Sequence, residues 1–572
     1  MDSKKVFLSR IRIISILTIL VGLSIIARLF LLQIVRGDAY AYKADRSYQA
    51  TNNTFDRGTI FFQKKDGGRI SAGTINTGYL LAINPSQIKD PEKTYELLNE
   101  IIKIPEESFL AKAKKINDPY EEILDKVERE EADKITELKL EGVGLYKHKW
   151  RFYPGESMAS QTIGFLGYGS GDTLVGQYGL EKYYNETLDR KEEDLYKNIF
   201  AEIFSDVKEV ILEGDEREGD IVTTIEPSVQ NFLEEELSQV KEKYNPESAN
   251  GIVISPQTGE IIAMGHIPTF DLNNFRDVEN VSMYSNPLVE NVYEFGSVVK
   301  PLVLAAGIDL GVISSSTPFN DKGSVQVEDK TIYNFDKLGR GQITMQEVLS
   351  QSLNTGMVYA MQKIGRGNFK ERMLAYRLNE KTNIDLPNEA KGILTNLNEP
   401  RELEYATASF GQGISFSPVA LVRALSSLGN GGYLIRPHVV KSIDYKTGGE
   451  KTFEFLKEDQ PKILKDETSK EISKMLVYSV DHVYGNGKYM MEHYSIAAKT
   501  GTAQIPNPKG GYYEDRNLHS FIGYFPAYNP QFLVFLSITA PQGVRYAAET
   551  LSLPFFDIAK FLINYYEIPP DR

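Results

Sequence analysis

The sequence predicts an α+β fold divided into more than one domain, and three observations carry that prediction. The chain has 572 residues, whereas single domains typically hold about 100 to 200. Apolar residues make up 41% and charged residues 25% of it, which is the balance of folded globular protein. Short β-prone runs stand near residues 250 and 530 with helical segments between them, so distant strands are expected to close one sheet that helices cover.

The first forty residues predict a membrane anchor. Residues 13–35 form an almost unbroken apolar run, and a helix needs roughly 20 such residues to cross a bilayer. A cleaved signal peptide has an apolar region of only about 7 to 15 residues, so an uncleaved single span is favoured. Because residues 1–12 are basic, this tail is expected in the cytoplasm and everything after residue 36 outside the cytoplasmic membrane.

Composition excludes several kinds of chemistry. The net charge of −14 opposes attraction to nucleic acid, so no nucleic-acid partner is expected. The chain contains no cysteine, which rules out a thiolate nucleophile, disulfides and cysteine-ligated metals. The six histidines include no pair at metal-ligand spacing, so no metal or cofactor is expected. They are interpreted as structural, although His519 precedes an expected strand and would be able to line a cleft there.

Two extracytoplasmic domains are expected. Residues 36–243 are polar and include Tyr120–Lys139, whose apolar residues roughly follow helical spacing, and this part is interpreted as a spacer or interaction domain. The sequence changes near Asn245 from mostly polar residues to short apolar runs, so residues 244–572 are expected to form the domain that carries the chemistry. Its expected elements are a hairpin of Gly251–Ser255 and Glu260–Met264, helices at Pro301–Leu310, Ser417–Leu428 and Pro554–Tyr565, and strands at Ser495–Gln504, Ser520–Pro526 and Phe532–Ala540.

Three short motifs in the second domain are candidates for catalysis: Ser297-Val-Val-Lys300, Ser352-Leu-Asn354 and Lys499-Thr500-Gly501. Each spacing is weak by itself because the chain repeats it elsewhere, at Ser205/Lys208, Ser238/Lys241, Ser248/Asn250 and Lys446-Thr-Gly448. The residues around each occurrence separate the three candidate motifs from the repeats. Ser238/Lys241 lies in an acidic amphipathic stretch typical of a surface helix, and Lys446-Thr-Gly448 lies among polar residues typical of a hairpin turn.

Ser297 is the candidate nucleophile. It follows Gly296 and opens an apolar segment that predicts a buried helix, whose N-terminal N–H groups would favour a developing oxyanion. Lys300 stands three residues on, on the same helix face, and burial would lower its pKa enough for it to act as a general base. The alternative is a buried helix cap with a snorkelling lysine.

The other two motifs predict the rest of a cleft. The hydroxyl of Ser352 would shuttle a proton while the amide of Asn354 orients substrate. Small residues flank Lys499, as expected of an edge strand that lines a cleft, and Gly501 would leave room for a peptide to add itself as a further strand. Strict alternation turns Thr500 and Thr502 away from the face that carries Lys499.

In this order the three motifs resemble the signature of penicillin-binding proteins and serine β-lactamases. The resemblance is closer to class B penicillin-binding proteins, in particular the FtsI-like division transpeptidases, and it spans nearly the whole chain. Segments similar to that family also include Tyr293–Pro301 around the nucleophile, Gly411–Ile414 and Asn430–Gly432 downstream, and Arg57–Ile60, Arg151–Pro154 and Gly179–Glu181 in the non-catalytic pedestal.

The resemblance implies a transpeptidase domain with a sheet sandwiched by helices, on an elongated α+β pedestal. It implies that Ser297 attacks the penultimate D-Ala of a peptidoglycan stem peptide and that β-lactams acylate it covalently. By the same resemblance Lys300 is the base, Ser352 and Asn354 pass the proton and hold the peptide, Lys499 attracts the substrate carboxylate, and Thr500, Gly501 and Thr502 bind substrate. Backbone N–H groups of Ser297 and Thr502 would form the oxyanion hole.

Some features depart from the family or leave alternatives open. Phe295 stands where proline is usual, and the stretch after Ile60 lacks the expected Asp-Arg-x-Gly. No glycosyltransferase module is seen, so a SEDS-type glycosyltransferase and division proteins are the expected partners, while the choice of division over side-wall growth depends only on Asn354 in place of aspartate. A D,D-carboxypeptidase or β-lactamase is the enzymatic alternative. A non-catalytic division scaffold or β-lactam sensor is the alternative from another class.

Overall fold

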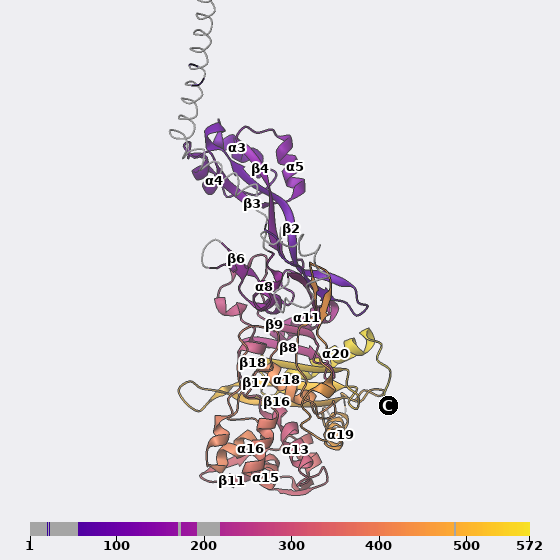
Figure 1. Cartoon of the computed structure of the whole chain (residues 1–572). Coiled ribbons are helices and arrows are strands. Elements are labelled where there is room, and N and C mark those ends of the chain that lie inside the picture. Colours follow the sequence, from indigo (N-terminus) through magenta and orange to yellow (C-terminus); the bar gives the residue numbers. More distant parts are fainter. Residues whose placement is uncertain (1–19, 21, 23–54, 170–172, 191–217, 485–487) are drawn as a thin grey trace, which may run out of the picture. The chain divides into compact units, whose positions relative to one another are not determined.

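A computed structural model describes residues 20, 22, 55–169, 173–190, 218–484 and 488–572 (Figure 1). The expected anchor at residues 13–35 lies outside the described residues except for Leu20 and Gly22. No helix within the described ranges has the length and apolar character that a membrane span requires. The chain divides into two compact units, Met1–Asp56 with Ile75–Phe152, and Arg57–Thr74 with Tyr153–Arg572.

The first unit is a small α+β layer. The second half of β2 (Arg69–Ile83) pairs with β3 (Glu121–Val127) and β4 (Val143–Phe152). Its helices are α3 (Pro91–Asn99), α4 (Glu106–Ala113) and α5 (Arg129–Glu137). The buried side chains that hold it together include Leu81, Leu98, Phe109, Val127 and Ile135.

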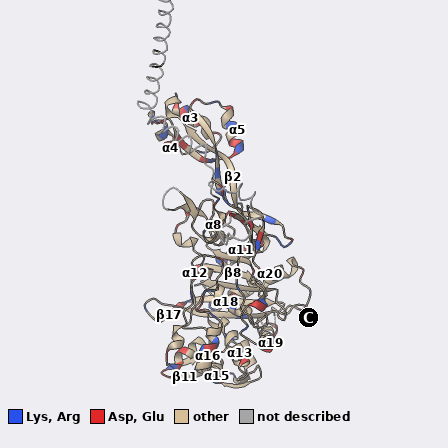
Figure 2. Ribbon diagram, in the orientation of Figure 1, with Lys and Arg blue, Asp and Glu red and all other residues tan. Residues whose placement is uncertain are grey.

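The helix expected over Tyr120–Lys139 is wrong in its first half. Residues Glu121–Val127 form β3, which pairs with β2 and so gains a ladder of backbone hydrogen bonds that local spacing does not reveal. The helix α5 begins only after Glu128, where the side chains of Glu128 and Glu131 form a capping box. Acidic and basic residues both lie on this helix, as Figure 2 shows.

The second unit is built on the sheet that the sequence predicts. Its five antiparallel strands lie in the order β16-β17-β18-β8-β9, so strands from both ends of the domain meet side by side. The expected hairpin is β8 (Ser248–Ile254) and β9 (Ile261–Ile267). The expected late strands are confirmed as β16 (Ala497–Pro506), β17 (Tyr512–Phe525) and β18 (Phe532–Thr539), with β16 at the edge.

Helices cover both faces of this sheet, because central strands such as β18 are apolar on both sides. On β18, Val534 and Leu536 pack with α11 (Pro227–Tyr244) and α20 (Ala547–Tyr565). The alternate residues Leu533 and Phe535 belong to the core of the opposite face. The helices on that face include α13 (Lys300–Asp309), α18 (Pro418–Ser426) and α19 (Asp466–His482), and the first two confirm the expected Pro301–Leu310 and Ser417–Leu428 helices.

The last helix begins earlier than expected. It starts at Ala547, after Tyr546 and Glu549 form a capping box, and it carries Pro554 inside rather than at its first turn. Two of the repeated motifs were interpreted as a surface helix and a hairpin turn, and the structure confirms both. Ser238 and Lys241 are on α11, and Lys446-Thr-Gly448 forms the turn between β14 (Val440–Tyr445) and β15 (Glu450–Thr452).

The remaining elements connect this framework. A second sheet of this unit has the order β15-β14-β7-β1-β2, with β1 at Ile60–Gln63, β7 at Gly219–Thr223 and the first half of β2. Three short antiparallel pairs are β5 with β6 (Leu166–Tyr168, Leu174–Gly176), β10 with β13 (Pro318–Asp321, Gly341–Thr344) and β11 with β12 (Ser324–Val327, Lys330–Tyr333). The other α-helices are α6 (Ser160–Ile163), α7 (Gly179–Tyr183), α8 (Asn185–Leu188), α12 (Pro287–Glu290), α14 (Met345–Ser350), α15 (Asn354–Ile364), α16 (Arg366–Ala375) and α17 (Glu402–Ala408).

A substitution of Phe535 tests the packing on the face of the sheet that α13 covers. The Phe535 ring is fully buried and lies 5.6 Å from the ring of Phe295. We expect Phe535→Ala to lower the free energy of unfolding by about 3 to 5 kcal/mol, because it leaves a cavity that the surroundings fill only in part. Denaturation followed by circular dichroism measures it. The control, Tyr528→Ala, alters a ring that is 54% exposed and should change stability by no more than about 0.5 kcal/mol. Equal losses would contradict this assignment of the core.

Candidate active site

The segment that carries Ser297 is held by contacts that only glycine permits. It forms the short 3₁₀ helix η5 (Gly296–Val299), which leads directly into α13. Gly296 has φ +62° and its N–H donates to the carbonyl of Gly411 at 3.2 Å. A Cβ on Gly411, which has φ +81°, would lie 2.2 Å from the Gly296 carbonyl oxygen. The Gly411 loop therefore fixes the turn that presents Ser297.

Phe295 stands where proline is usual in the family that the motifs resemble, and its ring has a structural role. It is fully buried, with its ring centroid 5.6 Å from that of Phe416 as well as that of Phe535. Its carbonyl oxygen accepts a hydrogen bond from Ser520 Oγ on β17 at 3.2 Å. The side chain thus anchors the loop to the sheet by packing, so the departure from the family affects how the loop is held and removes no catalytic group.

Lys300 is the first residue of α13 and is fully buried. Its Nζ lies 2.6 Å from the carbonyl oxygen of Ser352, 2.9 Å from Asn354 Oδ1 and 3.2 Å from Ser352 Oγ. Burial, with a further contribution from the charge of Lys499, lowers the pKa of this amine well below its usual range. The amine therefore releases its proton more readily than a free lysine, which is the direction that a general base requires.

Ser352 lies in the tight connection between α14 and α15, and Asn354 is the first residue of α15. Ser352 has φ +56°, a left-handed conformation that is uncommon outside glycine and is held by its surroundings. The Asn354 Nδ2 donates to the carbonyl of Tyr333 at 3.1 Å, which turns Oδ1 toward Lys300. The backbone of the β11–β12 hairpin therefore sets the orientation of the amide.

A buried polar cluster beneath this connection was not identified from the sequence. The carboxylate of Asp321 accepts from Thr355 Oγ1 at 2.8 Å, from the Asn334 amide at 3.0 Å and from the N–H groups of Gly323 and Arg340. The Asn334 Oδ1 in turn accepts from the Thr355 N–H at 3.2 Å. These contacts tie the start of α15 to the β10–β13 region. No motif spacing marks Asp321, so only the structure reveals it.

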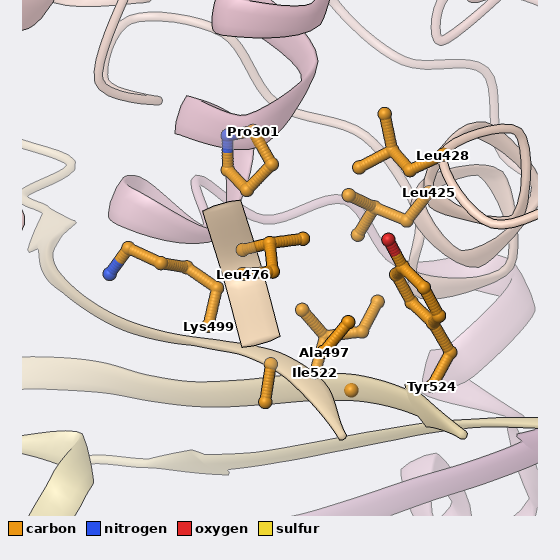
Figure 3. A pocket seen from close by; sticks show the side chains of 10 residues that line it. Pro301, Leu425, Leu428, Leu476, Ala497, Lys499, Ile522 and Tyr524 are labelled. Atoms are coloured by element: carbon orange, nitrogen blue, oxygen red, sulfur yellow. The ribbon is translucent and has the colours of Figure 1, made fainter. Parts of the chain in front are cut away.

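Lys499 completes the convergence of the three motifs. It lies on β16, is 1% exposed, and its Nζ donates to Ser352 Oγ at 3.0 Å and to the Thr500 carbonyl at 2.8 Å. Burial lowers the pKa of Lys499 to about 7. Its stem borders a small apolar cavity lined by residues such as Leu476 and Tyr524, and Figure 3 shows its amine pointing away from them. The Ser352 hydroxyl therefore lies between the two lysine amines.

The backbone of Thr502 faces η5, the segment that carries the candidate nucleophile Ser297, which is called the nucleophile segment below. A Cβ built on Gly296 would come within 3.1 Å of the Thr502 carbonyl oxygen. The N–H of Thr500 donates to a side chain outside the sheet, so alternation turns the N–H and carbonyl of Thr502 outward as well. The Thr502 hydroxyl accepts from the N–H of Ala547 at 3.0 Å, which joins β16 to the start of α20.

Glycine is required at position 501 for a different reason from the one predicted. A Cβ there would lie 2.6 Å from the Phe295 carbonyl oxygen and 2.5 Å from Ser520 Oγ. The space is occupied by the nucleophile segment itself, which packs against β16. Gly501 therefore allows the first motif to approach the third, and the room that was predicted for a substrate peptide is not there.

An open cleft of about 1290 Å³ unites most of the predicted residues. Ser297, Ser352, Asn354, Lys499, Thr500 and Thr502 all line it. Lys300 is buried behind it, and no hydrogen bond joins Ser297 Oγ to Lys300 in the described ranges. His519 does not line the cleft. It is fully buried, and its ring nitrogens lie 3.0 Å from Thr550 Oγ1 and 3.1 Å from the Arg545 carbonyl. The part of the chain that the structure describes gathers no group of three metal-ligating side chains.

Comparison with protein families identifies both parts of the chain. A family model described as the penicillin binding protein transpeptidase domain matches residues 250–558. A second, described as the penicillin-binding protein dimerisation domain, matches residues 57–194. The chain therefore belongs to the penicillin-binding protein transpeptidases, and the dimerisation domain beside the catalytic one is that of a class B member.

Individual relatives agree with this assignment. Stage V sporulation protein D of Bacillus subtilis is 30% identical over 95% of this chain and 84% of its own length. Peptidoglycan D,D-transpeptidase FtsI of Escherichia coli is 25% identical over 77% of this chain and 71% of its own. Penicillin-binding protein 2X of Streptococcus thermophilus has the same fold, with a TM-score of 0.71 at 20% identity over 90% of this chain and 80% of that chain.

A solved structure with a ligand in its description also matches. Penicillin-binding protein 3 of Mycobacterium tuberculosis, complexed with aztreonam, aligns with a TM-score of 0.67 at 20% identity, covering 91% of this chain and 98% of that one. At this identity the likeness establishes the fold alone. Together with the first structure it confirms the α+β transpeptidase fold that the motifs predict.

The depressed pKa of Lys499 should make stability depend on pH. The folded chain releases this proton near pH 7, whereas an unfolded chain retains it to about pH 10.4. Between these values the unfolded state binds more protons, so stability rises with pH across that window. Lys499→Met removes the effect. We expect the variant to be the more stable at about pH 6 and its advantage to shrink by on the order of 2 kcal/mol by about pH 9.

Calorimetric unfolding at a series of pH values measures this difference. The control is Lys560→Met, which alters a lysine whose side chain is 56% exposed. Its stability should follow that of the native chain at every pH. Parallel curves for Lys499→Met and the native chain would show that Lys499 titrates normally.

Proposed function

We propose that the chain is a serine-type peptidoglycan D,D-transpeptidase, which cross-links stem peptides through an acyl-enzyme on Ser297. The observation that carries the proposal is the Ser352 hydroxyl, 3.0 Å from the amine of Lys499 and 3.2 Å from that of Lys300. Three segments far apart in the sequence supply these groups, and Ser297 lines the same cleft. The D,D-transpeptidase names of relatives such as the Escherichia coli FtsI support the reaction type.

In the first half of the reaction, Ser297 Oγ attacks the carbonyl carbon of the penultimate D-Ala and its proton passes to the neutral amine of Lys300. A neutral amine has two N–H donors and one lone pair. The two donors suit the Ser352 carbonyl and Asn354 Oδ1, its closer partners, at 2.6 and 2.9 Å. The lone pair is then left to accept a proton, which supports Lys300 as the general base.

The negative charge that develops on the carbonyl oxygen is stabilised by two backbone donors, the N–H groups of Ser297 and Thr502. The first lies at the start of the 3₁₀ turn that leads into α13, and the second faces outward from the edge of β16. When the intermediate collapses, the C–N bond breaks and the departing D-Ala nitrogen takes a proton through Ser352 Oγ. Lys499 can resupply this hydroxyl, because it donates to the same oxygen.

In the second half, the amine of a neighbouring stem peptide attacks the acyl-enzyme, the ester bond to Ser297 breaks, and its oxygen regains the proton. The same groups serve in reverse: Lys499, which gave up a proton in the first half, accepts one from the incoming amine through Ser352 Oγ, and Lys300 supplies the proton that Ser297 regains. Replacement of that amine by water would give a D,D-carboxypeptidase or β-lactamase. Mass spectrometry of products from a donor and acceptor stem-peptide pair separates these: cross-linked dimer indicates transpeptidation, and shortened monomer alone indicates hydrolysis.

The remaining predictions complete the proposal. Residues 1–12 would be cytoplasmic and 13–35 the membrane anchor, with 36–243 as the pedestal and 244–572 as the transpeptidase domain outside the bacterial cytoplasmic membrane. Because the chain would cross-link strands without polymerising them, a SEDS-type glycosyltransferase is the proposed partner, together with division proteins. The name FtsI on several relatives supports a role in division.

The nucleophile can be tested by covalent labelling. We expect a fluorescent penicillin to label the native chain at a single peptide containing Ser297, because the strained lactam acylates the attacking hydroxyl. Ser297→Ala should abolish the label, whereas Ser238→Ala, on the surface helix α11, should retain it in full. Labelling of Ser297→Ala at a native rate would refute the assignment, and absence of any labelling in the native chain would refute the proposed function.

The oxyanion donor on β16 can be removed by a single substitution. Thr502→Pro deletes the outward N–H, and no ladder bond of the sheet is lost because that group faces away from β17. Loss of one such donor should slow acylation by about 10²- to 10³-fold. Thr502→Val retains the N–H and loses only the acceptor for Ala547, so its rate should fall far less. Stopped-flow acylation by penicillin measures both, and similar rates for the two variants would exclude the N–H as the donor.

A further inference from the structure

The edge of β16 is partly closed by a residue outside the three motifs. Tyr484 follows α19 and lines the cleft beside Lys499 and Thr500. Its hydroxyl donates to the carbonyl of Ala498 and accepts from the N–H of Thr500, each at 3.3 Å. These are the backbone groups through which an added strand would bind. The phenol of Tyr484 therefore occupies the place of a peptide bond at this edge.

The neighbouring carbonyl of Thr500 is occupied as well, since Lys499 Nζ donates to it at 2.8 Å. The first outward pair without such a partner in the described part of β16 is the N–H and carbonyl of Thr502. A substrate can thus pair with β16 from Thr502 onward. Toward Thr500 and Ala498 the edge is closed.

The direction of the substrate follows from the charges. The proposed oxyanion donor is the N–H of Thr502, so the carbonyl under attack lies beside that residue. A strand that adds antiparallel to β16 has its C-terminal end toward Thr500, the side on which the amine of Lys499 attracts a carboxylate. Strand residues advance about 3.4 Å each, so one residue beyond the scissile bond brings the chain end level with Gly501, just short of Thr500. A second residue would meet the Tyr484 phenol.

We propose that Tyr484 is a specificity-determining residue, which limits the leaving group to a single C-terminal residue by capping the edge of β16. This inference rests on the proposed function, because it takes the acyl-enzyme on Ser297 as given. It assigns to the side chain the selection of a substrate end, namely a free carboxylate one residue after the scissile bond. A bond that is followed by two or more residues is excluded, because the second of these residues has no backbone partner on β16 and no space.

The contacts of the Tyr484 side chain hold its ring and hydroxyl in place. Its ring packs against the apolar core beneath β16, with its centroid 6.5 Å from that of Phe521. Burial raises the pKa of the phenol to about 12, so the hydroxyl retains the proton that it donates to Ala498. A neutral phenol also closes the edge without a negative charge that would repel the carboxylate of the substrate.

Two β-lactams test the inference by their rates of acylation. The first is benzylpenicillin, whose ring nitrogen and adjacent carboxylate stand in for the departing D-Ala. The second is the same molecule with that carboxylate joined to glycine through an amide, so that the leaving side is one residue longer. The measured quantity is the ratio of the two acylation rates at Ser297, followed by mass spectrometry, because this ratio does not depend on how much of a preparation is folded.

We expect the native chain to react at least tenfold more slowly with the extended compound, and Tyr484→Ala to reduce that discrimination by tenfold or more. Tyr484→Phe keeps the ring and loses both hydrogen bonds, so its discrimination should lie between those of the other two. The control is Tyr478→Ala, which changes a 43% exposed ring of α19 and should leave the ratio as in the native chain.

The outcomes separate the two proposals. If benzylpenicillin does not acylate Ser297 in the native chain, the proposed function fails and this inference fails with it. If benzylpenicillin acylates the native chain and Tyr484→Ala, but the ratio is the same in both, the function stands and Tyr484 does not determine this specificity. If the native chain accepts the extended compound as readily as benzylpenicillin, the edge is open and the inference is overturned.

Discussion

The structure of the site depends on one constraint, which is that two lysine amines are buried around a single hydroxyl. A buried ammonium group is costly unless it is paired, and the described contacts of Lys300 and Lys499 are with neutral oxygens rather than with carboxylates. The protein therefore lowers the pKa of both amines, that of Lys499 to about 7. That tendency makes an amine available as a base, and the Ser352 hydroxyl between the amines gives the proton a short path.

The framework keeps these groups together by close backbone packing more than by charge. Gly411 admits the carbonyl of Gly296, and Gly501 admits that of Phe295, so the nucleophile segment is held between a loop and the edge strand. On the other side, the Asp321 carboxylate collects donors that fix the start of α15, and with it Asn354. A site made from three distant segments needs such supports, because each motif has to hold its geometry within a fraction of an ångström.

Sequence reasoning succeeded where chemistry requires particular residue types at fixed spacing. The Ser297, Ser352 and Lys499 motifs were found in this way, and the strand that carries the last of them was predicted from the small residues on both sides of the lysine. It failed where partners are chosen by tertiary contact. Local spacing assigned Glu121–Val127 to a helix, although pairing with β2 makes it a strand. Asp321 and Tyr484 belong to no motif, and their roles follow only from the groups that the fold brings to them.

The edge of β16 shows how one strand can serve two purposes without conflict. An edge strand with free backbone groups binds a peptide, but it also invites unwanted pairing along its length. Here side chains cover the groups of Ala498 and Thr500, while those of Thr502 face the cleft beside the nucleophile. Under the proposed function, binding is thereby restricted to the point where the Thr502 N–H serves as the oxyanion donor. By the same proposal, the contacts that protect the edge also fix the register of a substrate, so that reaction occurs at only one of its bonds.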